Sequence, residues 1–148
     1  MPNMKAHSGF TVFEIIMVLV IFLVLVGVSV PFYSYFQSFS ASESAKQEVL
    51  EIIRLTHAKA IAGENNTNHG VYYNNTQWTT YQGNDYAGRV QIYDQTFELP
   101  NNLSFSSSGE VNFQINTGIP SSTNAITLIN SINDSTQTIS INSLGLLE

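Results

Sequence analysis

The chain has 148 residues, which is enough for one domain, or for one domain and a membrane anchor. It carries 5 lysines and arginines against 11 aspartates and glutamates, and the resulting net charge of -6 argues against nucleic acid as a partner, because phosphate binding needs cationic side chains. The chain has no cysteine, which excludes disulfides, thiolate zinc sites and a cysteine nucleophile.

Composition divides the chain into four parts. A short polar segment comes first, followed by an apolar segment, a segment with a helical pattern, and a segment rich in Asn, Ser, Thr, Gly and aromatic residues. In chain order these parts are residues 1–9, 10–33, 34–62 and 63–148.

The apolar segment has the length of a membrane span. No charged residue occurs from Ile15 to Val30, and with Phe10–Phe13 the run reaches the ~20 residues that cross a hydrocarbon core of ~30 Å. A cleaved secretory signal is one interpretation, with Gly27–Ser29 as the nearest match to a cleavage site. Its basic head would be weak and its apolar core long, so a single-pass anchor fits the segment better.

Glu14 lies inside this apolar segment, where a plain anchor has no use for an acid. An ionisable group in a membrane helix costs several kcal/mol and indicates a functional position with a partner. No lysine or arginine occurs between Lys5 and Lys46, so the segment itself offers no cation. A new amino terminus would supply one if the chain were cut between Gly9 and Phe10.

The residues around this bond resemble the class III signal of type IV prepilins and type II secretion pseudopilins. The match consists of Gly9-Phe10-Thr11-Val12-Phe13-Glu14, a short leader with Lys5, and an apolar run that ends at Pro31-Phe32. The resemblance implies that residues 1–9 are a leader, which an inner-membrane prepilin peptidase removes after Gly9 before it methylates Phe10. The chain would then be the substrate of an enzyme and not an enzyme itself.

This resemblance also implies a place and a role. The chain would be a subunit of a type II secretion pseudopilus or a type IV pilus, first held in the bacterial inner membrane with its head outside the cytoplasm. Its partners would be the peptidase, other pilins or pseudopilins and the membrane assembly platform. Assembly would use Thr11, Glu14 and Pro31, with the Glu14 carboxylate neutralising the Phe10 amine of a neighbouring subunit or of its own chain.

Residues 34–62 are expected to continue the helix that starts at about Phe10. Apolar residues and small residues recur there with a spacing of three and four, which marks one buried face: Ala45, Val49, Ile52, Ile53, Thr56 and Ala60. Pro31 predicts a kink, and Gly63 predicts the end of the helix. The aromatic residues just after the kink would lie at the headgroups or against neighbouring helices: Phe32, Tyr33, Tyr35 and Phe36.

Past Gly63 the hydrophobic period changes to two, which predicts a β-rich head packed on the helix, and therefore an α+β fold with antiparallel strands. The predicted strands are 71–73, 77–81, 89–93, 96–99, 103–106, 111–115, 125–129 and 136–141. Turn residues separate them at Asn74-Asn75, Gly83–Asp85 and Gly118–Pro120.

The order of features in the head resembles the H-type minor pseudopilins of type II secretion and the T-type minor pilins of type IV pili. The features are Leu99-Pro100, a Gly109–Phe113 strand, an apolar strand at Ile126–Leu128 and a closing strand that ends at Gly145. Some T-type minor pilins bind DNA through arginines near the closing glycine. Here the nearest preceding arginine is Arg89, which weakens a DNA-uptake role. A tip adhesin and a major pilin stay open as alternatives.

Other residue types that can carry chemistry are better explained as structural, and we assign no catalytic residue, cofactor or metal. His57 and His69 lack ligand partners at a suitable spacing, and Asn133–Ser135 with Asp85 or Asp94 is as well explained by turns as by calcium. An aromatic set could form a stacking surface, but strand alternation predicts that about half of it fills the core: Trp78, Tyr72, Tyr73, Tyr81, Tyr86 and Tyr93.

Overall fold

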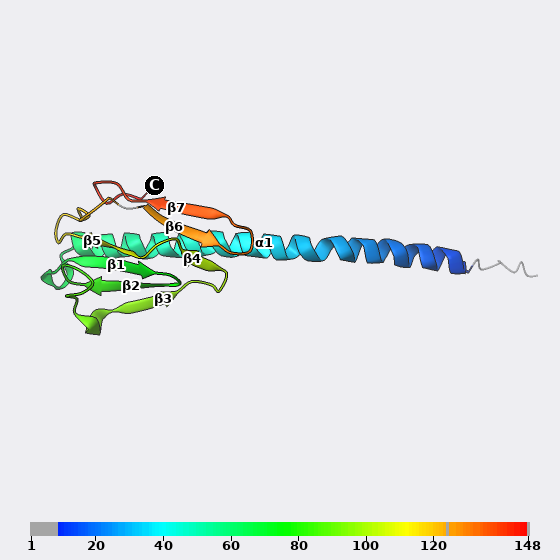
Figure 1. Cartoon of the computed structure of the whole chain (residues 1–148), viewed down its shortest axis with the longest axis horizontal. Helices are drawn as coiled ribbons and strands as arrows, with labels where there is room; N and C mark the ends of the chain where they lie inside the picture. Colours follow the sequence, from blue (N-terminus) through cyan, green and yellow to red (C-terminus); the bar gives the residue numbers. More distant parts are fainter. Residues whose placement is uncertain (1–8, 124, 148) are drawn as a thin grey trace, which may run out of the picture. The chain divides into compact units, whose positions relative to one another are not determined.

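The structure is a computed structural model that describes residues 9–123 and 125–147, without the side chains of Val30 and Pro31. A single long helix, α1 (Val12–Ile61), precedes seven strands and two short 3-10 helices. The chain forms two compact units, of which the second begins at Ser38. This order of elements confirms the α+β class predicted from the sequence (Figure 1).

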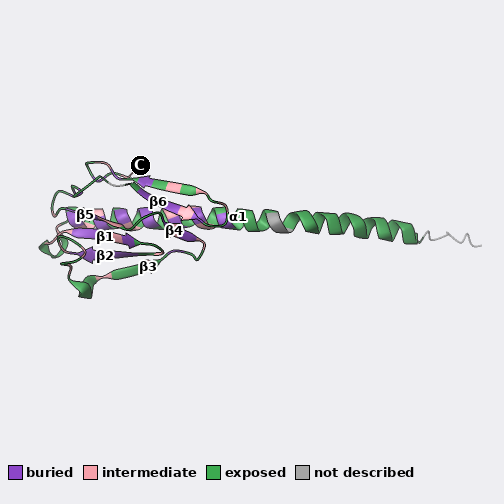
Figure 2. Cartoon of the chain, viewed as in Figure 1, coloured by how far each residue is buried: buried purple, intermediate pink, exposed green. Residues whose placement is uncertain are grey.

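In the first unit, α1 has an uninterrupted helical backbone that exposes its apolar side chains. Every described side chain from Phe10 to Gln37 is exposed (Figure 2). By length and composition this helix is able to cross a membrane. Ser29 is one of its few polar residues, and its hydroxyl donates to the carbonyl of Leu25 at 2.7 Å, which satisfies it within the helix.

In the second unit, the part of α1 from Ser38 onward packs on the sheets through one face. The buried face contains five of the six residues predicted from the spacing, and Ile52 is half-buried: Ala45, Val49, Ile53, Thr56 and Ala60 are the buried ones. Gly63 follows the helix with φ 67°, a left-handed conformation that favours glycine and ends the helix as predicted.

The first sheet has four antiparallel strands in the order β3-β2-β1-β5. The strands are β1 (His69–Asn74), β2 (Gln77–Gln82), β3 (Gln95–Glu98) and β5 (Gly109–Phe113). β1 and β2 form a hairpin in which Asn75 adopts φ 49°, in agreement with the predicted turn.

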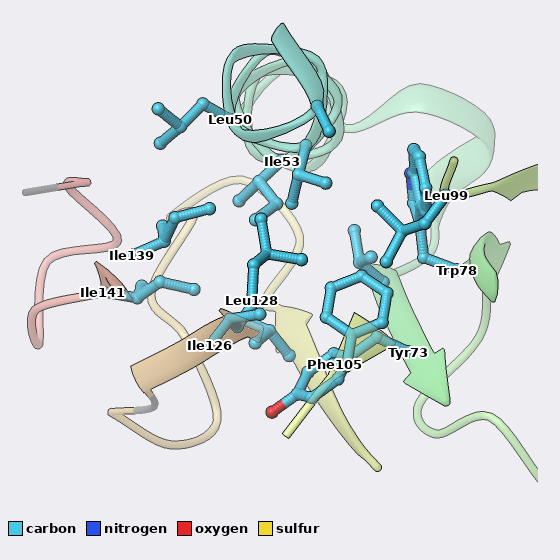
Figure 3. Packing of buried hydrophobic residues seen from close by; sticks show 14 of the residues in the cluster. Leu50, Ile53, Tyr73, Trp78, Leu99, Phe105, Ile126, Leu128, Ile139 and Ile141 are labelled. Carbon is cyan, nitrogen blue, oxygen red and sulfur yellow. The ribbon is translucent and has the colours of Figure 1, made fainter. Parts of the chain in front are cut away.

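The second sheet has three antiparallel strands in the order β4-β6-β7. Its strands are β4 (Leu103–Phe105), β6 (Ala125–Asn130) and β7 (Thr136–Ser140). Side chains of both sheets meet α1 in one core, in which Ile53 of the helix points toward Leu128 of β6, with Leu99 and Trp78 to one side (Figure 3).

One predicted strand is wrong. Residues 89–93 do not form a strand, because Gln91–Tyr93 is the 3-10 helix η2. The Arg89 side chain explains the compact turn: it donates to Asp94 at 2.7 Å and to the carbonyl of Tyr86 at 2.6 Å. These local hydrogen bonds hold the segment in a compact turn. The alternation of apolar residues in the sequence does not predict such bonds.

Candidate functional site

The predicted cleavage site lies in an exposed stretch before α1. Gly9 and Phe10 are outside the helix, and Phe10 is 79% exposed. A protease needs an accessible backbone, and the bond between these two residues lies in an exposed stretch outside the helix. The rest of the predicted leader, residues 1–8, lies outside the described part of the chain.

Thr11 caps the start of α1. The backbone N–H of Glu14 donates to the Thr11 hydroxyl at 3.3 Å, which satisfies one of the free donors in the first turn. The spacing Thr-x-x-Glu is that of a capping box, in which the glutamate at the third helical position also favours the helix start. This signal was visible in the sequence, but the sequence reading treated Thr11 and Glu14 as assembly residues only.

Glu14 lies in the first turn of α1 and is exposed. The positive end of the helix dipole favours an acid at this position. Within residues 9–123 and 125–147 the ion pairs are Lys59 with Glu64 and Arg89 with Asp94, and neither involves Glu14.

Pro31 has a helical backbone within α1, and its side chain lies outside the described part of the chain. The aromatic residues that follow it are exposed. Phe32, Tyr33, Tyr35 and Phe36 have exposed fractions of 77%, 69%, 59% and 67%. Such a group of exposed aromatic side chains needs either a lipid interface or another protein surface.

The two histidines of the head both have neighbours within the fold. His69 is buried, and its Nε2 lies 3.0 Å from the carbonyl oxygen of Glu64. The ring of His57 packs on Phe113 with the centroids 5.0 Å apart. Within the described ranges no group of three or more potential ligands could hold a metal ion.

The acidic and amide residues that could have formed a calcium loop are engaged in separate local structures. Asp85 accepts from the N–H of Gly88 at 2.6 Å, and Asp94 pairs with Arg89. Asn133 accepts from the N–H of Ser135 at 3.1 Å, as in an Asx turn. Each therefore has the turn role that the sequence suggested.

Of the six aromatic residues considered, Tyr73, Trp78 and Tyr81 are buried. Tyr72 stacks on Tyr86 with ring centroids 3.9 Å apart, so these two rings cover each other and not a ligand. Half of the set is thus buried, which is the proportion that the sequence predicted, although Trp78 and Tyr81 lie on opposite faces of β2 and are both buried. A free stacking platform is not what this set forms.

Tyr81 lies in a polar cluster beneath the loop after β2. Its hydroxyl donates to Glu110 at 3.2 Å and accepts from the amide of Asn112 at 3.2 Å. Burial raises the pKa of Tyr81 well above its usual range, and the Glu110 charge adds to this. The cluster fixes the loop through a second bond to Glu110 from the N–H of Tyr86.

A cavity of about 340 Å³ lies between α1 and η2. Its lining mixes aliphatic side chains such as Ile52 with polar ones such as Lys59 and Asp94. The Oδ1 atom of Asp94 is buried and has no hydrogen-bond partner within the described part of the chain. Sequence reasoning missed this cavity, because it depends on how η2 packs against the helix.

Comparison with family models, with curated proteins and with solved structures gave no match.

Proposed function

We propose that the chain is a minor pilin or pseudopilin, a structural subunit of a type II secretion pseudopilus or type IV pilus. The observation that carries this proposal is Glu14, an acid in the capped first turn of a helix whose other side chains in that unit are exposed and mostly apolar. Such a helix needs lipid before assembly and other helices after it.

Removal of residues 1–9 would create the counter-charge. A methylated amine at Phe10 stays protonated, so the mature chain would begin with a cation next to the capped helix start. In a membrane or a filament core the dielectric constant is low, which strengthens the attraction between this amine and the Glu14 carboxylate. A subunit that brings its Glu14 to the Phe10 of a neighbour would thereby gain a preferred register.

The head supports a structural role rather than catalysis. Three of its titratable residues, Asp85, Asp94 and Tyr81, are used in a turn, an ion pair and a buried hydrogen-bonded cluster. In this proposal the prepilin peptidase, other pilins and the assembly platform are the partners. The inner membrane is the first location, with the head outside the cytoplasm.

Mass spectrometry of the amino terminus tests the proposal. In a host with a prepilin peptidase, the chain should begin at Phe10 and carry one extra methyl group. A Gly9→Asp variant serves as the matched control, because it changes the cut position and leaves the helix unchanged; it should keep Met1. A wild-type chain that retains its leader in the assembled fraction would contradict the proposal.

A further inference from the structure

The outer edge of β3 presents backbone groups that no other strand of the described chain pairs with. The N–H of Leu99 donates to the carbonyl of Thr76 at 2.7 Å, so these residues are a hydrogen-bonded pair in the register of β2 and β3. Such pairs alternate along an antiparallel ladder. Phe97 therefore bonds to β2, whereas Thr96 and Glu98 direct their N–H and carbonyl groups outward.

The outer edge of β7 is open in the same way. The N–H of Asn130 donates to the carbonyl of Ser135 at 2.9 Å, which fixes the alternation between β6 and β7. It follows that Thr136 and Thr138 direct their backbone groups away from β6. Beyond them, Ile141 already pairs with the tail of the chain.

The remaining two edges, those of β4 and β5, are closed by the chain itself. Backbone N–H and carbonyl groups along them form hydrogen bonds of 2.6–3.0 Å with neighbouring loops. Leu103 and Phe105 of β4 donate to Pro100 and Asn75, while on the β5 side Gln114 donates to Ile119 and Ser121 donates to Asn112. The head thus has one open edge on each sheet, at β3 and at β7 (Figure 1).

Neither open edge carries the usual protection against pairing. Edge strands are commonly blocked by lysine, proline or a bulge. β3 and β7 hold one charged residue, Glu98, whose carboxylate already accepts from the Gln77 amide at 2.9 Å. Large apolar side chains stand exposed before each strand, Ile92 at 84% and Ile132 at 63%.

We infer that a second copy of this chain occupies these edges, with β3 of one copy pairing to β7 of the next. In an antiparallel register Thr96 lies opposite Thr138, and Glu98 lies opposite Thr136. β7 itself carries no charge that would repel Glu98. This inference rests on the proposed function, which brings the heads of neighbouring subunits close together. It deepens that function by naming a contact between those subunits.

This contact uses different surfaces on the two copies, so it is heterologous and does not use up both edges of either copy. Each pair leaves a free β7 on one copy and a free β3 on the other, and further copies can add in the same direction. Two outward residues on each edge provide few hydrogen bonds, so pairing is expected to be weak in dilute solution. Anchoring of the helices in one membrane or filament raises the effective concentration of the heads.

Disulfide cross-linking of the full-length chain tests the inference, since the natural chain has no cysteine. Opposite residues in an antiparallel pair have Cα atoms ~5.5 Å apart when hydrogen-bonded, which suits a disulfide. We expect Thr96→Cys with Thr138→Cys to give a ladder of dimers and larger multimers on mild oxidation in phosphatidylcholine vesicles. The control, Thr96→Cys with Ser107→Cys, places the second thiol on an exposed loop.

A ladder no stronger than that of the control would overturn the inference. So would dimers formed by Thr96→Cys alone, because they would indicate a β3–β3 contact. Adding Thr136→Pro to the cross-linking pair should abolish the ladder, since it removes an outward N–H at the first residue of β7 without breaking a bond to β6. If the proline variant does not fold, Thr136→Lys should do the same by charge and bulk.

The same cross-linking pair in cells separates this inference from the proposed function. A chain that begins at Phe10 and enters the sheared filament fraction without forming a ladder overturns strand pairing and leaves the filament role intact. A chain that forms the ladder in vesicles but keeps Met1 in cells contradicts the filament role and supports the pairing.

Discussion

Glu14 lies in the capped first turn of α1 and has a proposed role in assembly, and a substitution can separate the two. Glutamine also suits the third position of a capping box, so Glu14→Gln keeps the helix start and removes the charge. We expect Glu14→Gln to lose incorporation into filaments as strongly as Glu14→Leu, because in the proposed assembly the charge pairs with the amine of Phe10. The measurement is the amount of each variant in sheared filaments relative to the wild type.

A matched control is Glu51→Gln, which makes the same change at an exposed position of α1 in the head. It should enter filaments at the wild-type level. Wild-type incorporation of Glu14→Leu would contradict the assembly role of the Glu14 carboxylate.

Thr11→Val removes the cap and costs about 1 kcal/mol of helix stability, while Thr11→Ser restores the cap.

Tyr81 makes the stability of the head depend on alkaline pH. Burial raises its pKa above the ordinary value of 10.0, so the folded chain keeps a proton that the unfolded chain releases near pH 10. The stabilisation is fully present below that pH and is lost as the pH rises above it. Urea unfolding at pH 8 and pH 11 should show this fall.

Tyr81→Phe should reduce the fall, because phenylalanine has no proton to release. Part of it will persist through Tyr73, whose pKa is also raised by burial. At pH 8 the variant should lose about 1 kcal/mol through the two hydrogen bonds of the hydroxyl. An unchanged pH dependence in Tyr81→Phe would show that this group is not responsible.

At the scale of the elements, Asn130 connects β6 to the helix. It is buried, and its amide donates to the hydroxyls of Ser38 at 2.9 Å and Ser42 at 2.6 Å. Asn130→Ala would leave these hydroxyls without that donor and should cost about 1–3 kcal/mol of unfolding free energy. Asn101→Ala, at an exposed turn, should change it by less than about 0.5 kcal/mol. Equal losses in urea titrations would contradict the role of Asn130.

The elements that the sequence predicted are those determined by local periodicity. The spacing of Ala45, Val49 and Ile53 was sufficient to place the buried face of α1, and Gly63 was sufficient to end it. The strand predicted at 89–93 was wrong because the turn in this segment depends on hydrogen bonds from the Arg89 side chain. Side-chain alternation does not encode such bonds.

The pairing of strands was also beyond the sequence. Alternation gives the two faces of a strand, but it does not say which strand lies at an edge, because edges depend on tertiary order. The roles of Gly9, Phe10 and Glu14 stay predictions. These residues were singled out from the sequence because of their place at one end of an apolar run.

For the whole molecule, the division at Ser38 predicts that the two units have different solvent requirements. The first unit exposes apolar side chains over all of its described length, whereas the second has its own hydrophobic core. A chain that begins at Ser38 should therefore stay monomeric in dilute buffer without detergent. The full-length chain should need a membrane or detergent.

Trp78 is the reporter for this prediction, because it is the one tryptophan of the sequence and is 1% exposed. In the shortened chain it should emit at short wavelength and shift to longer wavelength in one cooperative transition with urea. A chain that begins at Val49 is the comparison, since it lacks Ser38, Ser42 and Ala45, three residues buried against the sheets. It should be much less stable. If the chain from Ser38 instead emitted like an exposed tryptophan or precipitated, the head would depend on the anchor for folding, and the separation into a membrane part and an independent head would be wrong.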